Sequence, residues 1–176
     1  MNSLVLRSAT PVDLPSIHEI YNFYVQTSTC TFELDPERFG DRLAWFENRG
    51  ELHPVIVAEL FGEVIGWGSL SAWNKRAGYA GTVEASVYVR QEWHRHGVGK
   101  SLLSELIERA KRLGHHVLIG GACTEQSGSI ALQEGLGLEQ VGTFRNVGYK
   151  FDRWLDVVYL QLLLDQPPDA PNGSEG

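Results

Sequence analysis

The tightest limit on the architecture comes from residues 87–103, which read VYVRQEWHRHGVGKSLL. An apolar strand ends there, a short basic loop follows, and an amphipathic helix begins at the pair Gly97 and Gly99. Glycine lets the backbone approach a ligand without an intervening Cβ atom. The first turn of a helix adds unpaired N–H groups at the positive end of the helix dipole. The turn therefore predicts an anion site suited to a pyrophosphate, with a glycine-opened helix carrying solvated basic side chains as the alternative.

Two other phosphate-binding motifs do not match this turn. A dinucleotide fold needs a longer glycine fingerprint after the first strand and an acidic residue about 20 positions further on, whereas this turn lies in the middle of the chain. A nucleoside-triphosphate loop needs Gly-x-x-x-x-Gly-Lys-Ser/Thr, and His94 stands where that motif has its first glycine.

The charge balance limits the partners of the chain. The formal net charge is −7, and a general nucleic-acid binder needs a basic footprint, so we expect no nucleic-acid partner. Positive charge gathers instead around the glycine turn, at Arg90, His94, Arg95, His96 and Lys100. No apolar run approaches the roughly 20 residues that cross a bilayer, and the N-terminal residues do not resemble a signal peptide. We therefore expect a cytoplasmic protein without a membrane partner.

Hydrophobic periodicity predicts an α/β protein. We expect strands at residues 4–8, 54–60, 64–71, 82–89, 116–122, 138–144 and 154–163, and helices at 11–25, 36–48, 97–113 and 127–134. This order suggests a mixed, mostly antiparallel sheet flanked by helices. Residues 1–165 form one predicted domain, and the Pro/Gly-rich tail 166–176 is predicted to be disordered. The six histidines show no metal-ligand spacing, so no metal is assigned.

The glycine turn resembles a known family signature. Residues 94–99 read His-Arg-His-Gly-Val-Gly, which is similar to the Arg/Gln-x-x-Gly-x-Gly/Ala acyl-CoA signature of the GNAT N-acetyltransferases, with histidine at the first position. The resemblance extends over residues 3–163 and is closest to the phosphinothricin acetyltransferase branch. It is carried by CTFELDP around Phe32, by residues 73–79, by TVEASVYV at 82–89, and by GYKFDRWLDV near the C-terminus.

The resemblance implies a GNAT-like fold in which acetyl-CoA lies between two splayed parallel strands, 82–89 and 116–122. It implies that the backbone of Val87, Tyr88 and Val89 pairs with the pantetheine amides. The remaining implied cofactor contacts are Arg95, His96, Gly97, Val98, Gly99 and Lys100 at the pyrophosphate, and Gln126, where the family usually has asparagine. The family often has tyrosine or histidine where this chain has Gln133.

Glu84 is the candidate catalytic residue. A carboxylate in an otherwise apolar strand is either the structural partner of a cation or a base with a raised pKa, and the resemblance implies the base. Arg76 precedes that strand, and its planar guanidinium suits a substrate carboxylate or phosphinate. The implied substrate-binding residues are Phe32, Trp73, Lys75, Arg76 and Tyr79. Asp156, by contrast, is predicted to be a structural hydrogen-bonding residue.

The resemblance implies an N-acetyltransferase that moves an acetyl group from acetyl-CoA to the amino group of a small amino-acid-like substrate of the phosphinothricin, methionine sulfoximine or methionine sulfone type. Two alternatives stay open: acetylation of another amine, such as a polyamine or a protein N-terminus, and a non-catalytic CoA-binding module. Five tryptophans and the aromatic C-terminal segment, together with the dimers usual in the branch, predict a homodimer.

Overall fold

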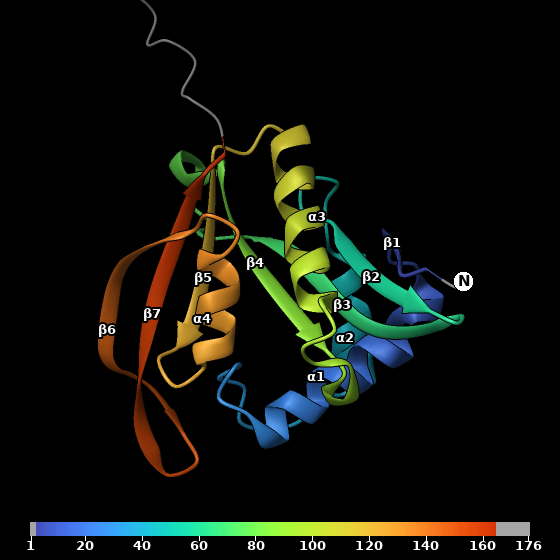
Figure 1. Ribbon diagram of the computed structural model, residues 1–176, viewed down its shortest axis with the longest axis horizontal. Helices are drawn as coiled ribbons and strands as arrows, with labels where there is room; N and C mark the ends of the chain where they lie inside the picture. Colours follow the sequence, from blue (N-terminus) through green and yellow to red (C-terminus); the bar gives the residue numbers. More distant parts are fainter. Residues whose placement is uncertain (1–2, 165–176) are drawn as a thin grey trace, which may run out of the picture.

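One seven-stranded sheet, in the order β1-β2-β3-β4-β5-β7-β6, organises the computed structural model, which describes residues 3–164 of the 176 (Figure 1). Its strands are β1 (Val5–Ser8), β2 (Val55–Leu60), β3 (Glu63–Ala72), β4 (Thr82–Val89), β5 (Val117–Cys123), β6 (Glu139–Lys150) and β7 (Arg153–Leu163). Every neighbouring pair is antiparallel except β4 and β5, which are parallel. The predicted mixed sheet is confirmed.

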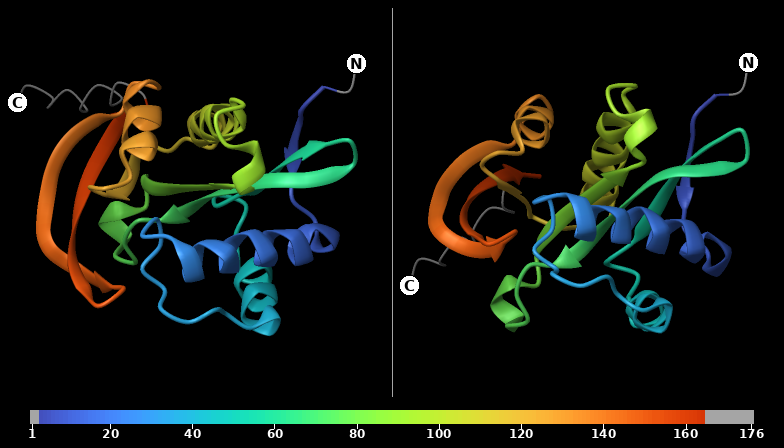
Figure 2. Two further views of the ribbon diagram at one scale, coloured as in Figure 1. Left: turned by 60° about the horizontal axis from the view of Figure 1, so that its bottom comes forward. Right: turned by 90° about the horizontal axis from the view of Figure 1, so that it is seen from below.

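Helices cover both faces of this sheet (Figure 2). One face carries α1 (Leu14–Thr27) and α2 (Phe39–Glu47), and the other carries α3 (Val98–Arg112) and α4 (Ser127–Glu134). The side of α3 that meets the sheet buries Leu102, Leu103 and Leu106, which recur at helical spacing. Within residues 3–164, no helix combines the length and the apolar character that crossing a bilayer requires.

Each face of the sheet has its own core. Alternate residues of a strand point to opposite faces, so β4 contributes Val83 and Val89 to the core beneath α3 and Tyr88 to the aromatic core beneath α1. In that second core, Trp67 stacks on Tyr88 with the ring centroids 4.8 Å apart. The two faces of β4 thus contribute side chains to two different cores, and one edge of the strand faces β5.

Several element bounds differ from the prediction. The helix predicted at 11–25 begins as a 3-10 turn, Pro11–Asp13, before α1, and the helix predicted at 36–48 begins only at Phe39. The strand predicted at 138–144 continues as β6 to Lys150. Its register shifts between Phe144 and Gly148, with Asn146 at φ 51°, and pairing with β7 then resumes. The predicted disordered tail, 166–176, lies outside the described residues.

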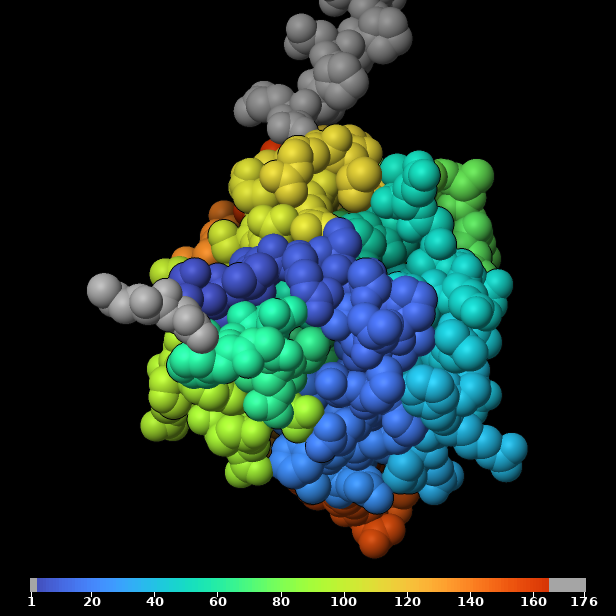
Figure 3. Space-filling view, turned by 90° about the vertical axis from the view of Figure 1, so that its right-hand side faces the viewer, coloured from blue at the N-terminus to red at the C-terminus, as the bar shows by residue number. Residues whose placement is uncertain are grey.

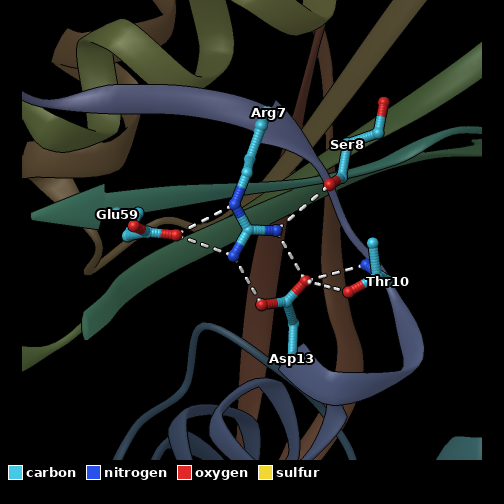
Figure 4. A network of polar contacts seen from close by, with 5 residues as sticks. All are labelled: Arg7, Ser8, Thr10, Asp13 and Glu59. Atoms are coloured by element: carbon cyan, nitrogen blue, oxygen red, sulfur yellow. Dashed lines mark hydrogen bonds and ion pairs between the residues drawn. The ribbon is translucent and has the colours of Figure 1, made fainter. Parts of the chain in front are cut away.

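A polar network fixes the N-terminal strand to α1 (Figure 4). The Arg7 guanidinium donates to both oxygens of Asp13, at 2.8 and 2.7 Å, and its Nε donates to Glu59 at 2.9 Å. Asp13 also accepts a hydrogen bond from the backbone N–H of Thr10 at 2.7 Å. The Arg7 guanidinium holds the pKa of the Asp13 carboxyl below its ordinary value. Figure 3 shows this end of the molecule, where the N-terminal segment lies between the β2–β3 turn and α3.

Candidate functional site

The parallel strands β4 and β5 pair over only three residues, Thr82 to Glu84, opposite Val117 to Ile119. Beyond Glu84 the two strands diverge (Figure 1), because β4 continues along β3 while β5 continues along β7. One edge of β4 therefore faces a gap in the sheet.

Strand alternation decides which backbone groups of β4 face that gap. Thr82 accepts a hydrogen bond from Trp73, and Arg90 donates one to Ile65, so the even-numbered residues direct their backbone groups towards β3. The odd-numbered Ala85, Val87 and Val89 direct theirs towards the gap. The even-numbered Tyr88 does not face the gap. Its carbonyl oxygen points towards β3, where it lies 3.0 Å from the position that a Cβ atom on Gly66 would take. Of the three residues predicted to contact pantetheine through their backbone, Val87 and Val89 direct backbone groups towards the gap, and Tyr88 does not.

Val89 already has a partner at this edge. The Tyr24 hydroxyl donates to the Val89 carbonyl oxygen, and His94 Nε2 lies 3.2 Å from the same oxygen. Tyr24 and His94 also contact each other and stack, with their rings 9° from parallel. The first residue of the signature therefore supports the end of β4 and occupies the Val89 carbonyl oxygen, which leaves the backbone N–H and carbonyl of Val87 facing the gap.

A cavity of about 990 Å³ occupies the gap. At its wide end lies the start of α3, where Gly97 has φ 82° and Arg95 has φ 63°. Arg95, Gly97, Gly99 and Lys100 line the cavity. His96 and Val98 do not: His96 is exposed with its Nδ1 2.8 Å from the His94 carbonyl oxygen, and the Val98 side chain is buried in the core. A basic helix N-terminus thus opens onto the wide end of the cavity, as an anion site requires.

Glu84 lies at the narrow end of the cavity, on the last pair of the parallel ladder. Its side chain is half-buried, and burial raises the pKa of its carboxyl above the ordinary value. Within residues 3–164 no cation forms an ion pair with it and no donor hydrogen-bonds to it, so a structural ion pair does not explain this carboxylate. The arrangement gives a carboxylate that binds a proton more readily than an exposed one.

Residues 28–32 and the end of β6 meet at the far wall of the cavity. Lys150 is 2% exposed and donates to the carbonyl oxygens of Ser28 and Thr31, each at 2.7 Å. Its burial lowers the pKa of its ammonium group. Phe32 lines the cavity, as predicted for a pocket residue, and its ring packs on Gly148. We call residues 28–32 the wall loop.

The wall loop also contacts the start of α4. Gln126 Nε2 donates to Thr29 Oγ1 at 2.9 Å, and Thr29 Oγ1 donates to Glu125 at 2.9 Å. Arg153 in turn pairs with Glu125 at 2.7 Å. Gln126 lines the cavity, but its amide nitrogen is engaged by the wall loop. Asp156 is structural as predicted, since it accepts the Asn146 backbone N–H at 2.7 Å.

The predicted substrate loop lies outside the cavity lining. Trp73 and Tyr79 pack edge to face, with ring centroids 5.2 Å apart, and each is 40% exposed. Lys75 and Arg76 are exposed, and the structure brings neither to the cavity. The 3-10 turn at Ala77–Tyr79 folds the loop upon itself.

Sequence reasoning assigned no site role to Lys150, Gly148 or Gln133, although all three lie at or behind the cavity wall. Lys150 and Gly148 belong to the segment GYKFDRWLDV. Lys150 lies between Tyr149 on β6 and Phe151 in the turn that follows, and a lysine flanked by aromatic residues is the signal that the sequence offers for a buried, partnered cation. Within residues 3–164, no group of three His, Cys, Asp or Glu side chains could hold a metal ion.

Comparison with known proteins identifies close relatives of this chain. The acetyltransferase (GNAT) family model matches residues 15–137. The L-methionine sulfoximine/L-methionine sulfone acetyltransferase of Pseudomonas aeruginosa is 41% identical over 171 residues, covering 96% of this chain and 99% of the relative.

Two solved structures extend the likeness to the fold. An acetyltransferase from Salmonella typhimurium with acetyl-CoA as its cofactor is 38% identical, with a TM-score of 0.91, covering 98% of this chain and 99% of its own. A phosphinothricin acetyltransferase from Sinorhizobium meliloti in complex with acetyl-CoA is 36% identical, with a TM-score of 0.88, covering 91% of this chain and 88% of its own.

Proposed function

The chain belongs to the acetyltransferase (GNAT) family, and on that premise we propose that it transfers the acetyl group of acetyl-CoA to the amino group of a small amino-acid-like molecule. The relatives act on L-methionine sulfoximine, L-methionine sulfone and phosphinothricin, and these are the proposed substrate type. The proposal places the reaction in the cytoplasm, where acetyl-CoA is available.

The observation that carries this proposal is the interrupted ladder between β4 and β5. It leaves backbone groups of Val87 facing an elongated cavity, with a basic helix start at one end and Glu84 at the other. Such an edge suits the amides of an extended pantetheine arm, and the α3 N-terminus suits a pyrophosphate. This orientation directs the thioester towards Glu84.

Glu84 is the proposed proton acceptor. A substrate amine is mostly protonated at neutral pH and must lose a proton before its nitrogen can attack. Bound acetyl-CoA supplies the electrophilic thioester, and Glu84 takes the proton directly or through a water. Its raised pKa, caused by burial, suits a base that works near neutral pH.

Arg76 is the proposed anchor for the acidic group of the substrate, with Trp73, Lys75 and Tyr79 beside it. The loop precedes β4 at the closed end of the splay, since Tyr79 lies three residues before Thr82 and Thr82 opens the parallel ladder. An Arg76→Ala variant tests this role, because it raises the KM of acidic substrates and spares amines without an acidic group.

A panel of amines tests the proposed function. Release of free CoA thiol is measured with L-methionine sulfoximine, L-methionine sulfone, phosphinothricin, spermidine and a short peptide. The proposal expects the highest kcat/KM with the three amino-acid-like substrates. A preference for spermidine or for the peptide overturns the substrate class, and the absence of turnover with every amine supports a non-catalytic CoA-binding module.

We also propose a homodimer formed through β6 and β7. Within residues 3–164, β6 pairs on one side only, with β7. The two strands expose large apolar side chains: Val141, Phe144, Val147, Tyr149, Trp154 and Leu163. Exposed apolar surface of this kind marks interfaces. Light scattering at micromolar concentration should give the dimer mass, and a Phe144→Glu variant should give the monomer mass; a monomer in the unaltered protein overturns the proposal.

A further inference from the structure

Tyr159 on β7 lies between two glycines. It pairs with Gly121 on β5 and with Gly142 on β6, so neither neighbouring strand places a side chain directly beside its ring. A Cβ atom on Gly142 would meet nothing within 4 Å, whereas a Cβ atom on Gly121 would meet Tyr159 Cε1 at 3.3 Å and Cδ1 at 3.6 Å. Phe144 of β6 packs edge to face against the ring, with the centroids 5.6 Å apart. The ring therefore leans across β5, with its hydroxyl end nearer to Gly121 than its Cβ end.

This lean points the ring towards Glu84. In the sheet, β5 lies between β7 and β4, and Glu84 on β4 pairs with Ile119, two residues before Gly121. Paired residues share a face of the sheet, as do residues two apart on one strand, so Glu84 and Tyr159 lie on the same face. Glu84 Oε1 lies 3.8 Å from the same Cβ position on Gly121 that Tyr159 Cε1 approaches. The carboxylate and the phenol therefore border one point of the cavity.

The Tyr159 hydroxyl is free to bind a ligand. Within residues 3–164 it makes no hydrogen bond, and it is not sealed from solvent as the unpaired atoms Trp67 Nε1 and Gln133 Oε1 are. Tyr159 is half-buried and lines the cavity. Burial, with the charge of Glu84 as the second cause, raises the pKa of its hydroxyl. The phenol therefore keeps its proton at neutral pH.

We propose that the Tyr159 hydroxyl oxygen binds the substrate amine beside Glu84; this rests on the proposed function. A primary ammonium group has three N–H donors, and a phenol oxygen accepts hydrogen bonds as well as donating one. One N–H points to the Glu84 carboxylate and a second to Tyr159 Oη. The two acceptors fix the nitrogen at the point that both side chains border.

The bond to Tyr159 outlasts the proton transfer. When one proton passes from the nitrogen to Glu84, the neutral amine still has two N–H groups, and one of them continues to donate to Tyr159 Oη. The amine thus stays at the narrow end of the cavity until it attacks the thioester. This arrangement favours primary amines, because the nitrogen needs two N–H donors to meet both acceptors.

Tyr159→Phe tests the contact because it removes the hydroxyl and keeps the ring. Calorimetry on the protein saturated with CoA, which has no acetyl group and permits no turnover, gives the Kd of L-methionine sulfone. We expect Tyr159→Phe to weaken this ligand about tenfold, the loss of one hydrogen bond to a charged group. Tyr149→Phe is the matched control and should leave the Kd unchanged, since Tyr149 is exposed on β6 and lies outside the cavity lining.

A second ligand shows which group of the substrate the hydroxyl contacts. The desamino analogue of L-methionine sulfone has a hydrogen atom in place of the amino group, and its Kd is measured by displacement of L-methionine sulfone. Tyr159→Phe should leave the Kd of the analogue unchanged, which also shows that the variant is folded. Equal losses for both ligands, or no loss for either, overturn the amine contact.

The unaltered protein separates the failure of this contact from the failure of the proposed function. If it binds and acetylates L-methionine sulfone, and Tyr159→Phe binds the ligand equally well, the amine contact is wrong and the proposed function stands. If it neither binds nor acetylates L-methionine sulfone, the proposed substrate type is wrong, and the amine contact is overturned with it.

Discussion

The ring of Phe32 lies directly on the backbone of Gly148, so closely that a single methyl group on Gly148 would overlap it. Phe32 belongs to the wall loop and Gly148 to β6, and both line the cavity. The shape of this wall therefore depends on the absence of one side chain.

A Gly148→Ala substitution should displace Phe32 and change the pocket. Overpacking of this kind costs about 1–3 kcal/mol, and we expect KM for the amine to rise while CoA affinity is kept, because CoA is expected at the opposite end. Steady-state kinetics and CoA calorimetry measure the two effects. Gly142→Ala on the same strand is the control, since a Cβ there meets nothing within 4 Å. Equal KM values for the two variants would contradict a role for the Phe32 contact.

Lys150 should be essential for the position of the wall loop. A Lys150→Met substitution leaves the carbonyl oxygens of Ser28 and Thr31 without their donor, and each unsatisfied buried acceptor costs about 1–3 kcal/mol. Urea unfolding should show the loss of stability, and hydrogen exchange should show faster opening of residues 28–32. Arg145→Met, at an exposed position of β6, serves as the control. Unchanged exchange in the loop would mean that other contacts suffice to hold it.

Glu84→Gln should lower activity and raise stability. Removing a general base costs about 10²–10⁴-fold in kcat, with partial recovery at high pH where free amine is abundant. Burial raises the pKa of Glu84 in the folded protein above its ordinary value of 4.5. At pH values between the unfolded-state and folded-state pKa, the folded state therefore binds more protons than the unfolded state. The free energy of unfolding therefore decreases as the pH rises from about 4.5 through the folded-state pKa, and the variant should lack this decrease. Near-native kcat from pH 6 to 9 would remove Glu84 from the role of base.

Gly97 should tolerate asparagine better than valine. Its φ of 82° lies in the left-handed region, which costs a side chain about 1–2 kcal/mol and a β-branched one more, whereas asparagine adopts it readily. We expect Gly97→Val to weaken CoA binding more than Gly97→Asn, by calorimetry, because valine distorts the first turn of α3. If a folded Gly97→Val protein bound CoA with the same affinity as the unaltered protein, this would argue against an anion site at this turn.

Asp13→Asn should destabilise the fold at neutral pH. Asp13 is 4% exposed and is held by Arg7. We expect the free energy of unfolding to fall by about 1.5 kcal/mol, which is the low end of the range for hydrogen bonds to charged groups. The low end applies because Arg7 is one-third exposed and water partly screens its charge. The lowered pKa of Asp13 means that this contribution is present above pH 3.8 and is lost as the pH falls through the folded-state pKa. Urea unfolding should show that the unaltered protein and Asp13→Asn differ less in their free energy of unfolding at pH 3 than at pH 7. The same difference at both pH values would exclude the ion pair as its source.

Local sequence determined the elements and their chemical types. The alternation in TVEASVYV predicted β4 with the bounds that the structure has, Thr82–Val89, and residues 127–134 form α4 as predicted. Gly97 and Gly99 predicted the start of α3 to within one residue. These signals are local because strand alternation, helical spacing and left-handed turns depend on neighbouring residues alone.

The place where those elements separate, and the side chains that meet in the gap, depend on contacts between distant parts of the chain. The end of the parallel ladder at Glu84 and Ile119 depends on β5 following β7, a pairing between residues about 40 positions apart. The same packing sets Gln133 against Gly120 and Phe32 against Gly148, and leaves Arg76 outside the cavity lining. A spacing pattern cannot predict such contacts, because they depend on how strands far apart in the chain twist past one another.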